Sequence, residues 1–272
     1  MEDNFTIYND NNFSLFGIFD GHAGSNTSYL ASEMMLTEVK SLIRTKNEQK
    51  FSDCFEHIQN EVKSQNLIDG CTAAVTFVYD NICYIGSIGD SRILRIKKNG
   101  FEQITKDQKA TIKHEYNRLK RLLLGVIDGR VKRKLALSRA IGDLWCGDGL
   151  FIKPKVKSYQ IDDEEIGLIV ACDGVWDVLT NEEAYKIFVN AKSPQDAATS
   201  LKNAAIANGS MDNVSVIVVF FHPEAKYSGV CYCNEIEKLP LVPEIESNDD
   251  EPFHTNRSAT IGVATLQRRR RR

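Results

Sequence analysis

The sequence predicts an α+β fold in which antiparallel sheets and pairs of helices form layers. Short apolar and β-branched runs, each bounded by turn residues, are typical of strands. They lie at 13–19, 72–78, 82–88, 93–96, 168–171 and 214–221. Asp80 and Asn81 separate two of these runs, as in a tight hairpin between antiparallel strands. The expected helices stand between groups of strands and do not follow every strand, so a βαβ alternation is not predicted.

Five segments have features that are typical of helices. Apolar residues recur at helical spacing in 29–44, and the segments 51–65 and 111–123 are further candidates. Thr180 and Glu183 have the spacing of a capping box, which would begin a helix after Thr180. Ser193 precedes Pro194, so a capping hydroxyl stands ahead of a proline at the first helical position.

The character of the sequence changes after residue 221. A segment with two prolines leads into an acidic, polar stretch, and five arginines follow at 268–272. Such a composition is typical of chain that does not join a packed core. We therefore expect one folded domain over 1–222 and an acidic, then arginine-rich, flexible tail over 223–272.

Charge and composition exclude several classes of protein. The 272 residues include 34 Lys and Arg against 37 Asp and Glu, and five of the basic residues are the terminal run. The rest of the chain is therefore acidic, which argues against nucleic acid bound by the core. A membrane span needs about 18 consecutive apolar residues, and the sequence has no such stretch.

The seven cysteines and the first residues indicate the cellular compartment. No Cys-x-x-Cys pair is present, which argues against a zinc ribbon or a thioredoxin-type site. The polar start is unlike a secretory signal, so reduced cysteines and a cytoplasmic location are expected. The arginines at 268–272 could form a nuclear localisation signal. The alternative, that they belong to a solvated tail without such a role, fits the sequence equally well.

Four aspartates adjoin the ends of predicted strands. Asp20, Asp90 and Asp173 follow apolar runs, and Asp212 precedes one. Carboxylates that converge repel one another unless a cation lies between them, and oxygen ligands select hard ions such as Mg²⁺ or Mn²⁺. Aspartate after a strand is also ordinary turn chemistry. The spacing alone leaves both interpretations open.

A histidine stands two residues after the first of these acids. The sequence Asp20-Gly21-His22 places a titratable imidazole beside the carboxylate, which suits proton transfer near neutral pH. A surface histidine beside a turn is the alternative.

Seven motifs, in the same order along the chain, resemble those of the metal-dependent type 2C protein serine/threonine phosphatases. They are MED at 1–3, FGIFDGHAG at 16–24, GCTAA at 70–74, IGDSR at 88–92, LSRAIGD at 137–143, ACDGVWDV at 171–178 and GSMDNVSV at 209–216. The resemblance covers about residues 1–221. It implies a four-layer fold in which an antiparallel β-sandwich is flanked by helix pairs, with a binuclear metal centre at one end.

The resemblance also implies which residues hold the two Mg²⁺ or Mn²⁺ ions. Asp20 would bridge them, and the carbonyl of Gly21 would be a ligand to one. Asp173 and Asp212 would bind the other ion. A water molecule made acidic by the two metals would attack phosphorus as a bridging hydroxide, and His22 would protonate the leaving oxygen as general acid.

Four further acids are expected at the edge of this centre. Glu2 and Asp3 would support the site through metal-bound water, and Asp177 with Asp90 match acids that the family links to a weaker third metal. The resemblance implies a monomer that acts on the phosphoserine and phosphothreonine of protein substrates.

The sequence departs from the family at its first residues. The family carries an opening strand and an arginine that holds the substrate phosphate a few positions before Met-Glu-Asp, and this sequence begins at Met1. Either the natural chain continues upstream, which we favour, or this form is a catalytically impaired regulatory or scaffold module. Without that strand an exposed sheet edge is expected. No substrate-binding residue is predicted.

Overall fold

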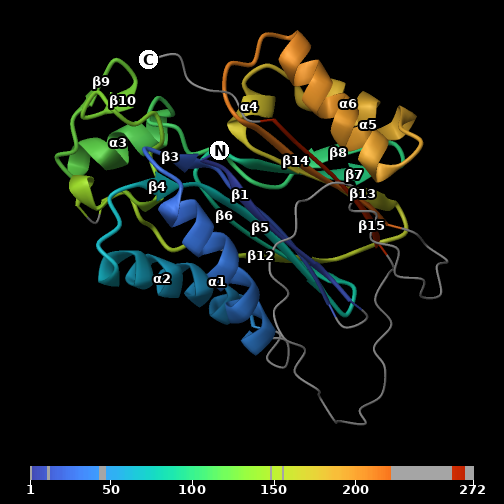
Figure 1. Ribbon diagram of the computed structural model, residues 1–272, viewed down its shortest axis with the longest axis horizontal. Coiled ribbons are helices and arrows are strands. Elements are labelled where there is room, and N and C mark those ends of the chain that lie inside the picture. Colours follow the sequence, from blue (N-terminus) through green and yellow to red (C-terminus); the bar gives the residue numbers. More distant parts are fainter. Residues whose placement is uncertain are drawn as a thin grey trace.

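The computed structural model describes residues 2–10, 13–42, 47–147, 149–154, 156–221 and 259–266. Two five-stranded antiparallel sheets pack face to face, and a pair of helices covers the outer face of each sheet (Figure 1). This is the four-layer α+β arrangement that the sequence predicted. Among the helices of the described residues, none is long and apolar enough to cross a membrane.

The first sheet has the strand order β1-β2-β5-β6-β12. Its strands are β1 (Asn4–Asn9), β2 (Phe13–Phe19), β5 (Ala73–Tyr79), β6 (Ile82–Ile88) and β12 (Lys157–Gln160). Its outer face is covered by α1 (Asn26–Leu42) and α2 (Glu48–Ser64). Asp80 and Asn81 form the turn between β5 and β6 with positive φ angles of 52° and 58°. The hairpin predicted from this pair is therefore confirmed.

The second sheet has the order β15-β14-β13-β7-β8. Its strands are β7 (Arg92–Lys97), β8 (Gly100–Gln103), β13 (Glu165–Ala171), β14 (Val214–Phe221) and β15 (Ala259–Leu266). Its outer face is covered by α5 (Asn181–Asn190) and α6 (Pro194–Ala207). Thr180 and Glu183 form the predicted capping box, and the Ser193 hydroxyl accepts from the Asp196 amide at the start of α6. Both predicted helix starts are confirmed.

The remaining elements are short, and most of them gather near one end of the sandwich (Figure 1). They are β3 (Gly21–His22), β4 (Gly70–Cys71), α3 (Lys113–Arg121), β9 (Val126–Ile127), β10 (Arg130–Val131), β11 (Ile141–Gly142), the 3₁₀ helix Leu144–Cys146 and α4 (Asp173–Trp176). The strands β11, β4 and β3 form a three-stranded sheet, and β9 and β10 form a hairpin.

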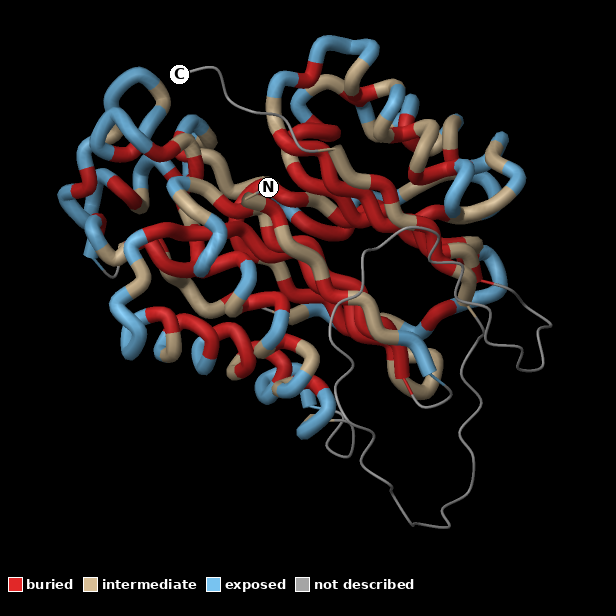
Figure 2. Tube along the Cα trace, viewed as in Figure 1, coloured by how far each residue is buried: buried red, intermediate tan, exposed pale blue. Residues whose placement is uncertain are grey.

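Strand β2 shows why the sandwich is stable. Leu15 and Phe19 face the helices of the first layer, whereas Phe16 and Ile18 pack between the two sheets against residues such as Leu168. All seven residues of β2 are buried, which explains an apolar run without polar alternation. Figure 2 shows the two sheets as the buried centre of the molecule.

The expected C-terminal tail needs a correction. Residues Ala259–Leu266 form β15, which pairs with β14 along its whole length. For these eight residues the prediction of a tail outside the fold is wrong, and β15 lies along the edge of β14 that was otherwise open. The rest of the expected tail lies outside the described residues. The segment is short and has few large apolar residues, so only its pairing partner reveals it as a strand.

Candidate active site

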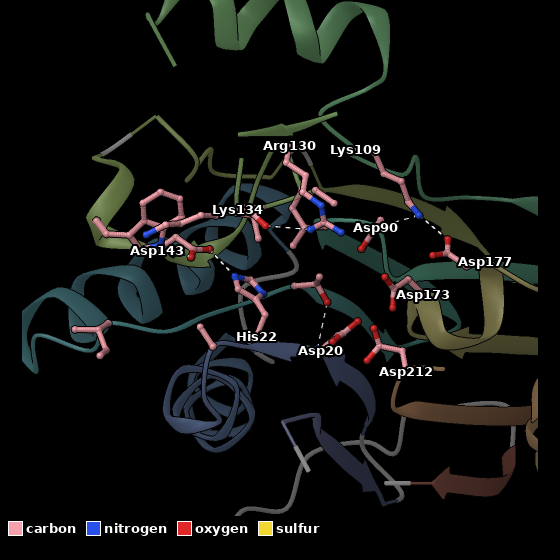
Figure 3. A pocket seen from close by; sticks show the side chains of 17 residues that line it. Asp20, His22, Asp90, Lys109, Arg130, Lys134, Asp143, Asp173, Asp177 and Asp212 are labelled. Carbon is pink, nitrogen blue, oxygen red and sulfur yellow. Dashed lines mark hydrogen bonds and ion pairs between the residues drawn. The ribbon is translucent and has the colours of Figure 1, made fainter. Parts of the chain in front are cut away.

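A pocket of about 530 Å³ opens at the end of the sandwich where several strands begin or end. Most of its polar lining is charged. The charged residues are Asp20, Asp90, Asp143, Asp173, Asp177, Asp212, Lys109, Arg130 and Lys134. His22 also lines it (Figure 3). Trp145 is a further lining residue.

Four of the aspartates come from strand ends in both sheets. Asp20 follows β2 and Asp90 follows β6, while Asp173 follows β13 as the first residue of α4. Asp212 lies two residues before β14, which is antiparallel to β13 and therefore starts at the same end. The sandwich thus brings together the four aspartates that the sequence singled out (Figure 3).

Few positive charges lie close to these aspartates, and the pKa values of three of them are raised above the ordinary value. Burial and the charges of Asp173, Asp3 and Asp90 raise the pKa of Asp20 well above its ordinary value. Burial and the charge of Asp173 raise the pKa of Asp90 to about 7. Burial and the charges of Asp177 and Asp212 raise the pKa of Asp173 to about 6. The pocket therefore holds negative charge at a cost that a bound cation would remove.

One internal cation does reach the acids. The ammonium of Lys109 lies 2.5 Å from Asp177 Oδ1 and 3.5 Å from Asp90 Oδ2. These are the two acids that the resemblance linked to a weaker third metal. Lys109 occupies the position between them, so a metal there would have to displace its ammonium. No role in the site was predicted for this lysine from the sequence.

His22 is held by an aspartate that the sequence analysis quoted in a motif but did not assign to the site. Its Nε2 lies 2.6 Å from Asp143 Oδ2, and Trp145 Nε1 donates to Asp143 Oδ1 at 2.8 Å. The absence of a side chain at Gly70 leaves room for the contact between His22 and Asp143, because a Cβ at position 70 would lie only 2.7 Å from His22 Nε2. Asp143 ends the LSRAIGD motif, which was the available indication of its role.

Three predicted site residues lie beside the pocket and do not line it. Asp3 is buried, and its Oδ2 accepts a hydrogen bond from Ser215 Oγ at 2.7 Å. Gly21 approaches the backbone of Glu2 so closely that a Cβ would clash with the Glu2 carbonyl. Asp3 still acts on the site, because its charge contributes to the raised pKa of Asp20.

The carboxylate oxygens of the pocket are donor atoms that a hard divalent cation accepts, although the side chains are not already arranged around one. Across the described residues, no group of three acidic, histidine or cysteine side chains is already arranged to hold a metal ion. The donor chemistry does fit, because hard divalent cations prefer oxygen ligands. Asp3 Oδ1 and Asp90 Oδ1 are also buried without a hydrogen-bond partner in the described part of the chain.

Comparison with known proteins identifies the family. The model of the protein phosphatase 2C family matches residues 1–214. The chain belongs to the protein phosphatase 2C family, whose members are serine/threonine phosphatases. A similar curated protein is "Probable protein phosphatase 2C 7" of Oryza sativa subsp. japonica, 34% identical over 81% of this chain and 62% of its own length. "Protein phosphatase 2C homolog 1" of Saccharomyces cerevisiae is 30% identical over 75% of this chain and 81% of its own length.

Solved structures agree in fold. A serine-threonine phosphatase 2C from Toxoplasma gondii has a TM-score of 0.67 at 24% identity, covering 81% of this chain and 90% of that chain. A sex determining protein of C. elegans has a TM-score of 0.72 at 23% identity, covering 80% and 61%. At these identities the likeness shows the fold alone. The chain spans 62%, 48% and 55% of the length of three curated relatives that it matches.

Proposed function

We propose that this chain is a metal-dependent protein phosphatase that hydrolyses phosphoserine and phosphothreonine in protein substrates. One observation carries the proposal: the sandwich gathers aspartates from four strand ends in one pocket, in a chain of the protein phosphatase 2C family. Their raised pKa values and the unpartnered oxygens of Asp3 and Asp90 support cation binding there.

Asp20, Asp173 and Asp212 would hold two Mg²⁺ or Mn²⁺ ions, with the Gly21 carbonyl as a further ligand. Two bound divalent cations supply a nucleophilic water at neutral pH and offset the charge of the phosphate. Ser215 donates a hydrogen bond to Asp3, and Asp3 in turn contacts Asp20. Asp3 would therefore orient Asp20 as a metal ligand without binding the metal directly. Glu2 would contribute through water.

His22 would hold a proton for the leaving oxygen. Asp143 fixes the orientation of the imidazole through Nε2, and Trp145 fixes Asp143 in turn. A ring held this way can donate its proton without first reorienting. We propose Asp143 as the positioning residue for His22.

Lys109 would serve as a fixed positive charge at the edge of the site. It neutralises part of the charge on Asp90 and Asp177. The third metal expected at these two acids stays a prediction, and the place of Lys109 counts against it. The expected monomeric state and cytoplasmic location also stay predictions.

The proposal is tested by phosphopeptide hydrolysis with Mn²⁺. We expect phosphoserine and phosphothreonine peptides to be hydrolysed in the presence of Mn²⁺ and spared in EDTA, with Asp173→Asn as the inactive control. Wild-type activity no higher than that of Asp173→Asn would favour the alternative of a catalytically impaired scaffold module.

A further inference from the structure

Two sides of the pocket carry opposite charge. Four of its aspartates come from strand ends of the two sheets. Residues 106–139, which contain α3 and the hairpin of β9 and β10, hold eleven Lys and Arg against three Asp and Glu. Arg130 and Lys134 of this segment line the pocket. Figure 3 shows Arg130 across the pocket from Asp20 and Asp212, so a basic wall faces these aspartates.

A tight turn presents the cations of this wall. Residues 130–134, here called the cationic turn, carry four positive charges in five positions, and the one apolar residue among them is fully buried. Lys132 and Arg133 have positive φ angles of 48° and 61°, which residues other than glycine seldom adopt. Arg130 Nη1 donates to the Lys134 carbonyl at 3.0 Å and closes the turn. Strained backbone of this kind clusters at sites that bind ligands.

The cationic turn lacks the carboxylate partners that neighbouring cations have. Lys109 pairs with Asp90 and Asp177, and Arg139 pairs with Glu115. Within the described residues, no carboxylate lies at ion-pair distance from the cationic turn. Its positive charges are therefore available to an anionic ligand.

An aromatic side chain ties the cationic turn to the catalytic side of the pocket. The ammonium groups of Lys132 and Lys134 lie 5.8 and 5.3 Å from the centre of the Trp145 ring, as in cation–π contacts. The indole N–H of Trp145 is bonded to the aspartate that holds His22. Trp145 and Ile68 line the same pocket and are 39% and 80% exposed, so apolar surface adjoins the cations.

The position of the cationic turn indicates what it binds. A peptide that presents one phosphorylated residue to the aspartates must place neighbouring residues against the walls of the same pocket. Guanidinium and ammonium groups bind both carboxylates and phosphates. Nucleic acid fits less well, because the aspartates that share this pocket of about 530 Å³ would repel a continuous phosphate backbone.

We propose that the cationic turn binds a second anionic group of the substrate, either a carboxylate or a further phosphate near the phosphorylated serine or threonine. The enzyme would then select acidic or multiply phosphorylated segments of proteins. This inference rests on the proposed phosphatase function. The anionic group at the turn is not the phosphate that is hydrolysed, so the turn acts on the choice of substrate.

The test compares the wild type with a double variant, Arg130→Gln with Lys134→Gln, on three phosphothreonine peptides. One peptide has alanines on both sides of the phosphothreonine, one has glutamates there, and one has a second phosphate on a neighbouring serine. Each contact between exposed charges contributes a factor of a few. With Mn²⁺ we therefore expect a wild-type kcat/KM about tenfold higher for the two anionic peptides than for the alanine peptide. In the double variant this ratio should fall to nearly one.

The matched control is Lys120→Gln with Arg121→Gln, which removes the same two kinds of charge from exposed positions of α3 outside the pocket. It should keep the wild-type ratio between the peptides. High salt should lower that ratio in the wild type, because exposed charges are screened. A larger gain from the second phosphate would assign the turn to multiply phosphorylated segments, and a larger gain from the glutamates would assign it to acidic ones.

Binding measurements separate this inference from the proposed function. Fluorescently labelled peptides are titrated with Asp173→Asn, with and without the double substitution, and anisotropy gives each Kd. If the wild type hydrolyses nothing, the proposed function fails. Tighter binding of the anionic peptides, lost on adding the double substitution, would still support the role of the turn. Hydrolysis and binding that treat the three peptides alike would overturn this inference alone.

Three further outcomes would overturn it. An equal loss of kcat/KM for all three peptides in the double variant would mean that the turn contacts the phosphate that is hydrolysed. An equal fall of the ratio in the α3 control would mean that only the overall charge of the segment matters. A single-stranded oligonucleotide that displaces the anionic peptides as effectively as they displace each other would identify a nucleic-acid surface.

Discussion

Two regions of the molecule bury carboxylates, and they shift the pKa values of these groups in opposite directions. In the acidic pocket, aspartates raise one another's pKa, and Lys109 is the internal cation that bonds them most closely in the described residues. In α3, Glu115 is only 1% exposed, and Arg118 and Arg139 both bond its carboxylate. Burial raises the pKa of Glu115, but the two arginines lower it more, to about 2.

The difference teaches how structural and functional carboxylates are distinguished. Arg118 also donates to the Gly149 carbonyl at 2.7 Å and to the Ser138 carbonyl, so the Glu115 cluster ties α3 to the segments beside the pocket. Its charge is balanced inside the fold. The aspartate pocket is left with net negative charge, which is the condition for binding an external cation.

The largest expected effect comes from removing a charge in the pocket. Asp20→Asn should lower kcat for a phosphopeptide by about a thousandfold, because the proposed bridging ligand is lost. The metal-free variant should be at least as stable as the wild type, since a repelling charge is removed. Steady-state kinetics with Mn²⁺ and urea denaturation in EDTA measure both. Asp53→Asn on α2, which does not line the pocket, is the control for activity, and activity equal to it would contradict the metal role of Asp20.

His22→Ala should give the next largest effect. We expect phosphopeptide hydrolysis to slow by about a hundredfold. Hydrolysis of p-nitrophenyl phosphate should slow much less, because its leaving group needs no proton. Parallel kinetics on the two substrates measure the difference. Equal losses on both would reject His22 as general acid.

Glu115→Gln should change stability and leave catalysis largely intact. Breaking a buried pair costs about 3–5 kcal/mol, and the arginines here are partly exposed, so we expect a loss of about 2 kcal/mol in the free energy of unfolding. Urea denaturation measures it, and the half-saturating Mn²⁺ concentration should not change. If the variant kept wild-type stability and bound Mn²⁺ more weakly, Glu115 would act in metal binding and not in stability, contrary to this prediction.

The smallest effect is a pH dependence of the metal-free protein. The folded pKa of Asp90, about 7, lies above its ordinary value of 3.8 because of burial and Asp173. A raised pKa contributes stability that is present at low pH and is lost as the pH rises through the folded value. We expect the free energy of unfolding in EDTA to fall by about 1 kcal/mol from pH 6 to pH 8.

The control for this dependence is Asp90→Asn, which should reduce it and leave the part that comes from Asp20 and Asp173, whose pKa values are also raised. Glu115 should act in the opposite direction and in another range: its lowered pKa contributes stability that is lost only as the pH falls from about 4.5 toward 2. Metal-free protein that gains stability between pH 6 and pH 8 would contradict the assignment for the pocket.

Local patterns in the sequence were sufficient for much of the fold. The capping residues Thr180 and Ser193 and the turn at Asp80 and Asn81 act on their immediate neighbours, so their effect can be predicted without tertiary contacts. Apolar runs predicted strands such as β14 for the same reason. The strand ends also located the aspartates, because the end of one strand and the start of its antiparallel neighbour lie at the same edge of the sheet, as for Asp173 and Asp212.

Contacts between distant segments of the chain could be decided only by the tertiary structure. His22 meets Asp143, 121 residues further along the chain, and Asp3 meets Ser215 across 212 residues. Lys109 lies between Asp90 and Asp177 because three loops converge, which no local pattern encodes. The sequence by itself determined that aspartates stand at strand ends. The structure decided which partners balance their charge, and that β15 pairs with β14, because pairing and burial depend on what packs nearby.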